Sequence, residues 1–98
     1  MHTRDEDILC RYGGEEFILL MPDSNTANAL KRAEQLCALV RNTLRINHQG
    51  ITYQLTISLG VSAFPESGHT IEAAQKAADT ALNDAKRQGR DRVVVAAS

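Results

Sequence analysis

The residues with the clearest chemical potential stand together in the stretch RYGGEEF, residues 11–17. Two carboxylates, Glu15 and Glu16, follow two glycines, Gly13 and Gly14, between two apolar runs. Glycine suits tight turns because it adopts positive φ without steric cost, so residues 7–21 are predicted to form a β-hairpin with strands 7–12 and 15–21. The carboxylates would then lie at the tip of a hairpin.

Pairing these strands across a two-residue turn places Arg11 opposite Glu16 and Tyr12 opposite Glu15. A cross-strand ion pair between Arg11 and Glu16, worth roughly 0.2–1 kcal/mol, is a sufficient structural reason for Glu16. Glu15 has no such partner. It is therefore either solvated at the turn or a ligand of a cation, and the hairpin alone does not decide between the two.

A second charged pair lies near the other end of the chain. Lys86 and Arg90 are one helical turn apart and bracket Gly89. They either offset the dipole at the C-terminus of a helix or grip phosphate oxygens, lysine as a point charge and arginine as a fork. Carboxylates on a turn, together with a Lys/Arg pair on another element, are the components of a metal–triphosphate site.

The segment between the two charged pairs predicts one helix and one strand. An amphipathic helix is expected from Ala27, after cap residues in DSNT. A half-buried strand is expected over residues 55–61, where apolar and small or polar residues alternate, preceded by a short turn at NHQG. The expected apolar positions of the helix are Leu30, Ala33, Cys37, Val40 and Leu44.

The last part of the chain predicts a second helix and a final strand. Thr70 is the expected cap of the helix, Gly89 its expected terminator, and residues 92–95 the strand. The order β-β-α-(β)β-α-β indicates an α+β fold, which one further β-α unit in front would complete as a split βαββαβ arrangement. The inward face of the helix is expected to be small: Ala74, Ala78, Ala81, Leu82 and Ala85.

Composition narrows the class of protein. The 98 residues allow one domain, and a net charge of −1 gives no electrostatic reason to expect a nucleic acid or an anionic membrane as partner. No apolar run approaches the roughly 20 residues that span a bilayer, and the start of the chain has no signal-peptide core. Cys10 and Cys37 are expected to be buried reduced thiols, which favours a cytoplasmic location.

Three blocks, RYGGEEF, LTISLGVS and ADTALNDAKRQGRDRV, occur in an order that strongly resembles the diguanylate cyclase family, the GGDEF domains, with glutamate at the third motif position. The resemblance covers nearly the whole chain from Arg4 onward. It implies a nucleotidyl-cyclase-like, antiparallel-rich sheet flanked by helices. It also implies the activity of the family, which condenses two GTP into cyclic di-GMP and releases pyrophosphate.

The resemblance assigns roles to the charged residues. Glu15 would be a ligand of the Mg²⁺ (or Mn²⁺) that bridges the triphosphate. Glu16 would lie at the active site and help to activate the 3′-hydroxyl. Lys86 and Arg90 would hold the β- and γ-phosphates.

The two glycines and the oligomeric state follow from the same resemblance. Gly13 and Gly14 would let the backbone approach GTP closely, which a Cβ would block. Each subunit would hold one GTP, so two copies must meet as a homodimer.

A second site is implied upstream of the turn. Arg4 and Asp7 match the RxxD motif, which binds the product cyclic di-GMP and restrains the enzyme in relatives. The alternative is a charged entry to the strand. Gln35 occupies a position where many relatives have a further arginine, so the resemblance implies weaker product binding here.

The chain also departs from the family in what it lacks. The family's first strand, with a metal-binding aspartate and the guanine contacts, has no counterpart, so residues 1–98 are expected to be the C-terminal portion of a GGDEF domain. This piece is expected to be inactive alone. Its strands over 15–21 and 53–61 would each have an unpaired edge, so the piece would pair with another copy, rearrange its sheet or aggregate. The alternative function is a degenerate module that binds GTP or cyclic di-GMP without catalysis.

Overall fold

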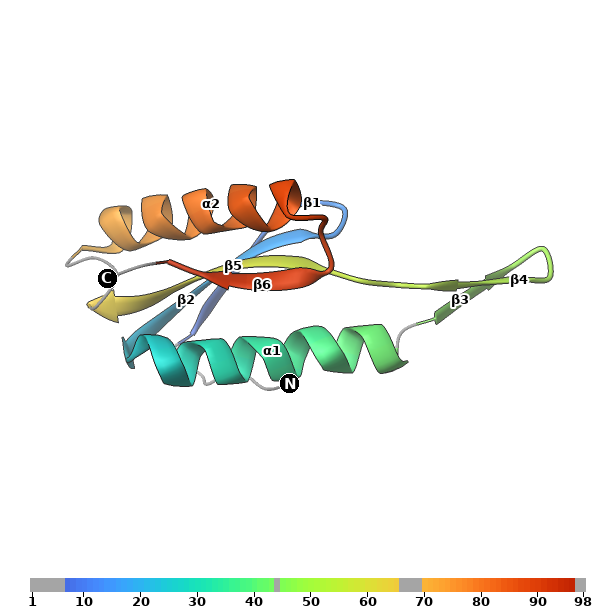
Figure 1. The fold of residues 1–98 in the computed structure, drawn as a ribbon, viewed down its shortest axis with the longest axis horizontal. Coiled ribbons are helices and arrows are strands. Elements are labelled where there is room, and N and C mark those ends of the chain that lie inside the picture. Colours follow the sequence, from blue (N-terminus) through green and yellow to red (C-terminus); the bar gives the residue numbers. More distant parts are fainter. Residues whose placement is uncertain (1–6, 44, 66–69, 97–98) are drawn as a thin grey trace.

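A four-stranded sheet lies between two helices, and a separate two-stranded hairpin projects from one end (Figure 1). The computed structural model describes residues 7–43, 45–65 and 70–96. This arrangement confirms the predicted α+β class. The elements in chain order are β1 (Ile8–Gly13), β2 (Glu16–Ser24), α1 (Thr26–Thr43), β3 (Arg45–His48), β4 (Ile51–Gln54), β5 (Ser58–Pro65), α2 (Ile71–Arg87) and β6 (Arg92–Val95).

The strand order of the main sheet is β1-β2-β5-β6. β1 and β2 are antiparallel, whereas β2 pairs with β5 and β5 with β6 in parallel, so two of the three pairings are parallel where an antiparallel-rich sheet was expected. β2 and β5 satisfy each other's backbone groups from Glu16↔Ser58 onward, and the edges predicted to be unpaired are closed.

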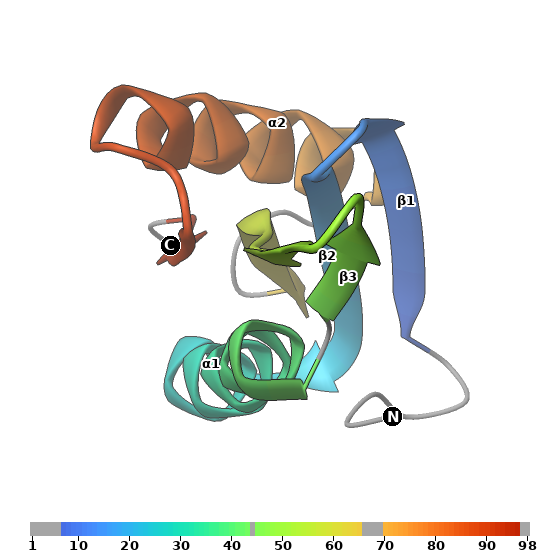
Figure 2. The ribbon, with the colours of Figure 1, turned by 90° about the vertical axis from the view of Figure 1, so that its right-hand side faces the viewer.

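The second strand is apolar along its length because both of its faces are covered. Leu19 and Met21 pack in the core beneath α1, whereas Ile18 and Leu20 pack in the core beneath α2. In the view of Figure 2, α2 lies above the sheet and α1 below it. A continuous apolar run is typical of a strand that is buried on both sides.

The prediction that residues 55–61 form a half-buried strand was wrong in two respects. The strand begins at Ser58, and its small and polar positions face α2 instead of solvent. The hydroxyl of the fully buried Ser62 donates a hydrogen bond to the Ala74 carbonyl at 2.8 Å. Gly60 lies against the backbone of α2, where an added Cβ would come within 2.3 Å of the Ala78 carbonyl oxygen. Small residues on β5 therefore let the second helix approach closely.

The two helices begin where the sequence predicted caps. The Asn25 side chain accepts a hydrogen bond from the Asn28 N–H at 2.8 Å, and the Thr70 hydroxyl accepts one from the Ala73 N–H at 3.1 Å. The predicted small face of α2 is confirmed residue by residue. On α1 the prediction for Leu30 was wrong, because this side chain is 38% exposed and Ala29 is buried in its place.

Three further features complete the description of the fold. The β3–β4 hairpin points away from the sheet, and its residues are exposed (Figure 1). Both cysteines are free thiols; Cys37 is buried as predicted, whereas the prediction for Cys10 was wrong, because its side chain is only half-buried. Within the described ranges, neither helix has the length and apolar character needed to cross a membrane.

The close approach of β5 and α2 predicts that Gly60→Ala destabilises the chain. The new methyl group would collide with the backbone of α2, at 2.3 Å from one atom and 2.4 Å from another. We expect a loss of roughly 3 kcal/mol in the free energy of unfolding, measured by urea denaturation with circular dichroism. Gly14→Ala is the control, because a Cβ at that glycine meets nothing within 4 Å. Equal stability of the two variants would contradict this packing.

Candidate active site

The glycine turn is shifted by one residue from its predicted position. β1 and β2 pair as Arg11↔Phe17 and Gly13↔Glu16, with an irregularity between Arg11 and Gly13, and the turn residues are Gly14 and Glu15. The predicted ion pair between Arg11 and Glu16 was therefore wrong. The Arg11 guanidinium instead donates hydrogen bonds to the carbonyl oxygens of Gly13 at 3.1 Å and Gly14 at 3.2 Å. Arg11 thus secures the backbone of the turn.

The expectation that the two glycines supply positive φ at the turn was wrong. Neither Gly13 nor Gly14 has a positive φ. A Cβ on Gly13 would lie 3.3 Å from Oε1 of Glu16, so a side chain there would crowd this carboxylate. Gly14 faces open space, and its Cα is accessible to an approaching ligand.

Glu16 brings the two ends of the chain together. Its Oε1 lies 3.3 Å from Nζ of Lys86, and its Oε2 accepts a hydrogen bond from Nη1 of Arg90 at 2.8 Å. The predicted Lys/Arg pair is therefore adjacent to the glycine turn, and Glu16 is the residue that joins the two. Sequence reasoning missed this partnership because the Glu16 and Arg90 positions are 74 residues apart.

The end of α2 fixes the positions of both cations. The N–H of Arg90 donates to the Ala85 carbonyl at 2.9 Å, and that of Gly89 to the Lys86 carbonyl at 3.3 Å. These two bonds, with Gly89 at φ 115°, form the Schellman arrangement that ends many helices. Lys86 therefore lies in the last turn, and Arg90 directly follows the terminating glycine, as predicted.

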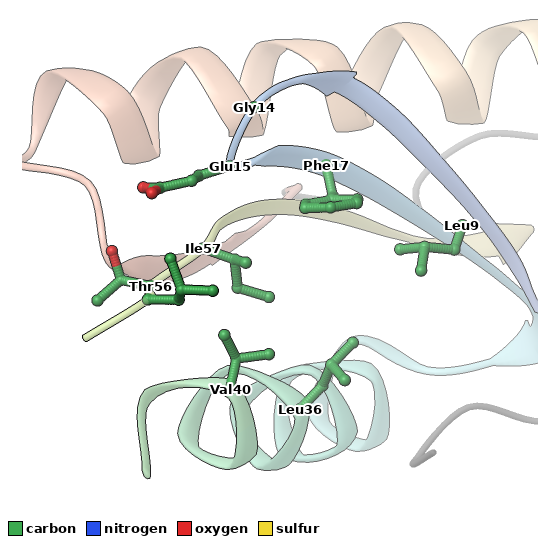
Figure 3. A pocket seen from close by; sticks show the side chains of 9 residues that line it. Leu9, Gly14, Glu15, Phe17, Leu36, Val40, Thr56 and Ile57 are labelled. Atoms are coloured by element: carbon green, nitrogen blue, oxygen red, sulfur yellow. The ribbon is translucent and has the colours of Figure 1, made fainter. Parts of the chain in front are cut away.

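Glu15 is exposed, and its backbone is attached to the sheet. Its carbonyl oxygen accepts a hydrogen bond from the Ser58 N–H at 2.8 Å, which ties the turn to the start of β5. Its side chain borders a cavity of about 420 Å³ between the hairpin, α1 and residues 55–57. Figure 3 shows the carboxylate at one end of this cavity, with Leu36 and Val40 of α1 on the opposite wall.

The described residues offer one carboxylate to a metal at this turn. No group of three histidine, cysteine, aspartate or glutamate side chains gathers around a common point within the described part of the chain. Mg²⁺ is usually held by one or two carboxylates together with substrate phosphates and water. Glu15 therefore fits as one ligand of a metal ion that arrives with a nucleotide, but it does not form a complete metal site.

Tyr12 forms a further contact beside the turn, which the sequence alone did not predict. Its hydroxyl oxygen accepts a hydrogen bond from Nε2 of Gln75 at 3.2 Å, which ties β1 to α2 beside the turn. A hydrogen bond to Asp79 raises the pKa of the Tyr12 hydroxyl, and the bond from Gln75 partly opposes this. The signal available in the sequence was weak, because an aromatic residue before a turn has many structural uses.

Of the proposed inhibitory pair, Arg4 lies outside the described residues, and Asp7 is half-buried just before β1.

The model of the family "Diguanylate cyclase, GGDEF domain" matches residues 1–92. The response regulator PleD of Caulobacter vibrioides is 43% identical over 94 residues, which are 95% of this chain and 21% of PleD. The diguanylate cyclase DgcZ of Escherichia coli is 37% identical over 91 residues, which are 92% of this chain and 30% of DgcZ.

A solved structure agrees with these sequence matches. The GGDEF domain of PA1120 (YfiN or TpbB) from Pseudomonas aeruginosa superposes with a TM-score of 0.74 at 32% identity, and the match covers 99% of this chain and 60% of that one. The chain belongs to the GGDEF domain family, whose model carries the name diguanylate cyclase. It spans between about a fifth and a third of the length of the two curated relatives named above.

The ion pairs of Glu16 predict an acidic titration. The hydrogen bond from Arg90, and then that from Lys86, lowers the pKa of Glu16 below its usual value. The stabilisation by these pairs is therefore complete above the ordinary glutamate pKa of about 4.3 and is lost as the pH falls through the lowered pKa of the folded chain. A ¹³C NMR titration of the Glu16 carboxyl should show this lowered midpoint, and Arg90→Gln should raise it. A midpoint unchanged by Arg90→Gln would contradict the assignment of Arg90 as the main cause.

Proposed function

We propose that this chain contributes to the active site of a diguanylate cyclase, which condenses two GTP molecules into cyclic di-GMP and two pyrophosphates. The observation that carries the proposal is the contact of Glu16 with Lys86 and Arg90, beside the turn that carries Glu15 at one end of the sheet. Carboxylates and cations in one place suit a magnesium triphosphate, which offers positive and negative groups together. Membership of the family supports the same activity.

In the proposed reaction, the 3′-oxygen of one GTP forms a bond to the α-phosphorus of the other. The bond from that phosphorus to the bridging oxygen breaks, pyrophosphate leaves, and the hydroxyl proton passes to solvent. A bound Mg²⁺ would neutralise charge on the triphosphate, with Glu15 as one of its ligands. Lys86 and Arg90 would hold the β- and γ-phosphates and favour departure of the pyrophosphate.

Glu16 is better suited to organising the two cations than to taking the proton of the 3′-hydroxyl. Both of its oxygens are bound by cations, and its lowered pKa makes it a weak base. Two cations around one carboxylate leave a net positive charge for a phosphate to bind. Glu16 would therefore keep Lys86 and Arg90 at a fixed separation before GTP arrives.

The proposal includes a homodimer and a cytoplasmic location. Each copy holds one GTP, and each reacting hydroxyl belongs to the GTP of the other copy, so two sites must face each other. The cytoplasm supplies both GTP and Mg²⁺. Neither a nucleic acid nor a membrane is needed as a partner of this segment.

The proposed metal ligand is tested by Glu15→Gln in the full-length protein that carries this domain. The substitution keeps the size of the side chain and removes its charge, so turnover of GTP with Mg²⁺ should fall by about a hundredfold or more. Glu72→Gln is the matched control, because Glu72 is an exposed glutamate in the first turn of α2 and lies outside the site. Unchanged turnover in Glu15→Gln would remove Glu15 from the metal site. A wild-type protein that binds GTP without forming cyclic di-GMP would support the receptor function instead.

The proposed inhibitory site at Arg4 and Asp7 is tested by Arg4→Ala in the same protein. We expect inhibition by added cyclic di-GMP to weaken by about tenfold, with basal turnover kept, because the guanidinium would bind guanine or phosphate of the product. The measurement is initial rate against product concentration. Identical inhibition curves for the two proteins would show that Arg4 belongs only to a charged entry to the strand.

A further inference from the structure

The backbone that carries Arg90 has an unusual conformation. Arg90 and Asp91 are consecutive residues with positive φ, 64° and 49°. Residues other than glycine rarely adopt this left-handed region, although aspartate and asparagine tolerate it better than most. Such a conformation persists only where the surrounding structure holds it in place. The surroundings of Asp91 therefore bear on the position of Arg90.

Arg41, in the last turn of α1, holds Asp91 with a forked contact. Its Nε lies 3.2 Å from each carboxylate oxygen of Asp91, and its Nη2 lies 3.0 Å from Oδ1. A guanidinium that binds a carboxylate through two nitrogens fixes its orientation as well as its distance. Each of the two side chains is 38% exposed, so this pair is partly shielded from solvent.

These contacts form a continuous series from one face of the sheet to the other. Arg41 on α1 binds Asp91, Asp91 is bonded to Arg90, and Arg90 binds Glu16 at the start of β2. We propose that Arg41 and Asp91 are a positioning pair, which aims the Arg90 guanidinium at the glycine turn and thereby sets its grip on an incoming polyphosphate. The part that concerns the polyphosphate rests on the proposed function. The part that concerns the orientation of Arg90 does not.

The alternative is that the pair only attaches the start of β6 to α1. In that case its loss would lower the stability of the chain without changing the conformation of Arg90 or its affinity for phosphate. The two roles are separated by measurements at Arg90 itself.

The decisive variant is Asp91→Asn, measured in the full 98-residue chain with inorganic triphosphate and Mg²⁺ by calorimetry. Asparagine keeps the tolerance for left-handed backbone but loses the charge that binds Arg41. Removal of a negative charge near an anion site weakens the repulsion of the anion, and this effect alone should strengthen binding of the triphosphate. The positioning role predicts the opposite sign, an affinity roughly threefold to tenfold weaker. Tighter or unchanged binding in this variant would overturn the proposal.

Further variants show whether the effect passes through Arg90. Arg41→Gln should weaken binding to a similar extent, and Arg41→Lys, which keeps the charge without the fork, should restore it only in part. Asp91→Asn should add no further loss to Arg90→Gln. The matched controls are Asp84→Asn and Arg87→Gln, because these residues form another ion pair near the end of α2. A comparable loss in these controls would reduce the effect to general electrostatics and contradict the proposal.

An NMR measurement separates failure of this inference from failure of the proposed function. In the wild type, Arg90 should show the strong intraresidue amide–Hα contact of a positive φ and slowed rotation of its guanidinium. Both signals should weaken in Asp91→Asn and remain in Asp84→Asn, with unfolding curves recorded to verify folding. A wild type that binds no triphosphate but shows these changes would contradict the proposed grip of Lys86 and Arg90 on phosphates and leave the positioning role supported. Unchanged Arg90 signals would overturn the positioning role.

Discussion

The structure depends above all on the parallel pairing of β2 with β5 between two helices. Both strands are buried on both faces, so their backbone groups must be satisfied by each other. The same pairing continues to the Ser58 N–H, which binds the carbonyl oxygen of Glu15. Glu16 is therefore the first residue of this ladder and Glu15 is hydrogen-bonded to it, although both lie beside a turn.

The alternation of side chains along a strand gives adjacent glutamates different surroundings. Glu16 follows the register of Ile18 and Leu20, which face α2, and so it meets Lys86 and Arg90 at the end of that helix. Glu15 precedes it and borders the cavity on the α1 side. One carboxylate is thus bound by protein cations, whereas the other is exposed beside the cavity. The different surroundings of Glu15 and Glu16 follow from the two-residue period of the strand.

Much of the fold could be predicted because its signals are local. The small face of α2, the Thr70 cap and the terminating Gly89 each depend on residues within a few positions of one another, and all were found. The prediction that residues 55–61 form a half-buried strand was wrong because, in a sequence, small and polar residues that alternate with apolar ones indicate a solvent-facing side. Gly60 in fact lies against the backbone of α2, and Ser62, just beyond the predicted range, donates a hydrogen bond to that helix. This packing role becomes visible only when the position of α2 against β5 is known.

By itself the sequence determined which residues have the chemistry for the site: carboxylates at a glycine turn, and a lysine and an arginine around a helix terminator. The tertiary structure alone decided how they combine. An irregularity in the hairpin shifts the strand pairing by one residue from the predicted register. Glu16 is therefore not opposite Arg11, and it forms ion pairs with Lys86 and Arg90. Local spacing cannot carry that information, because ion pairs between distant segments depend on the strand register and on where a helix ends. The sequence gives the type of each charged residue, whereas the packing of the strands and helices determines which charged residues form ion pairs.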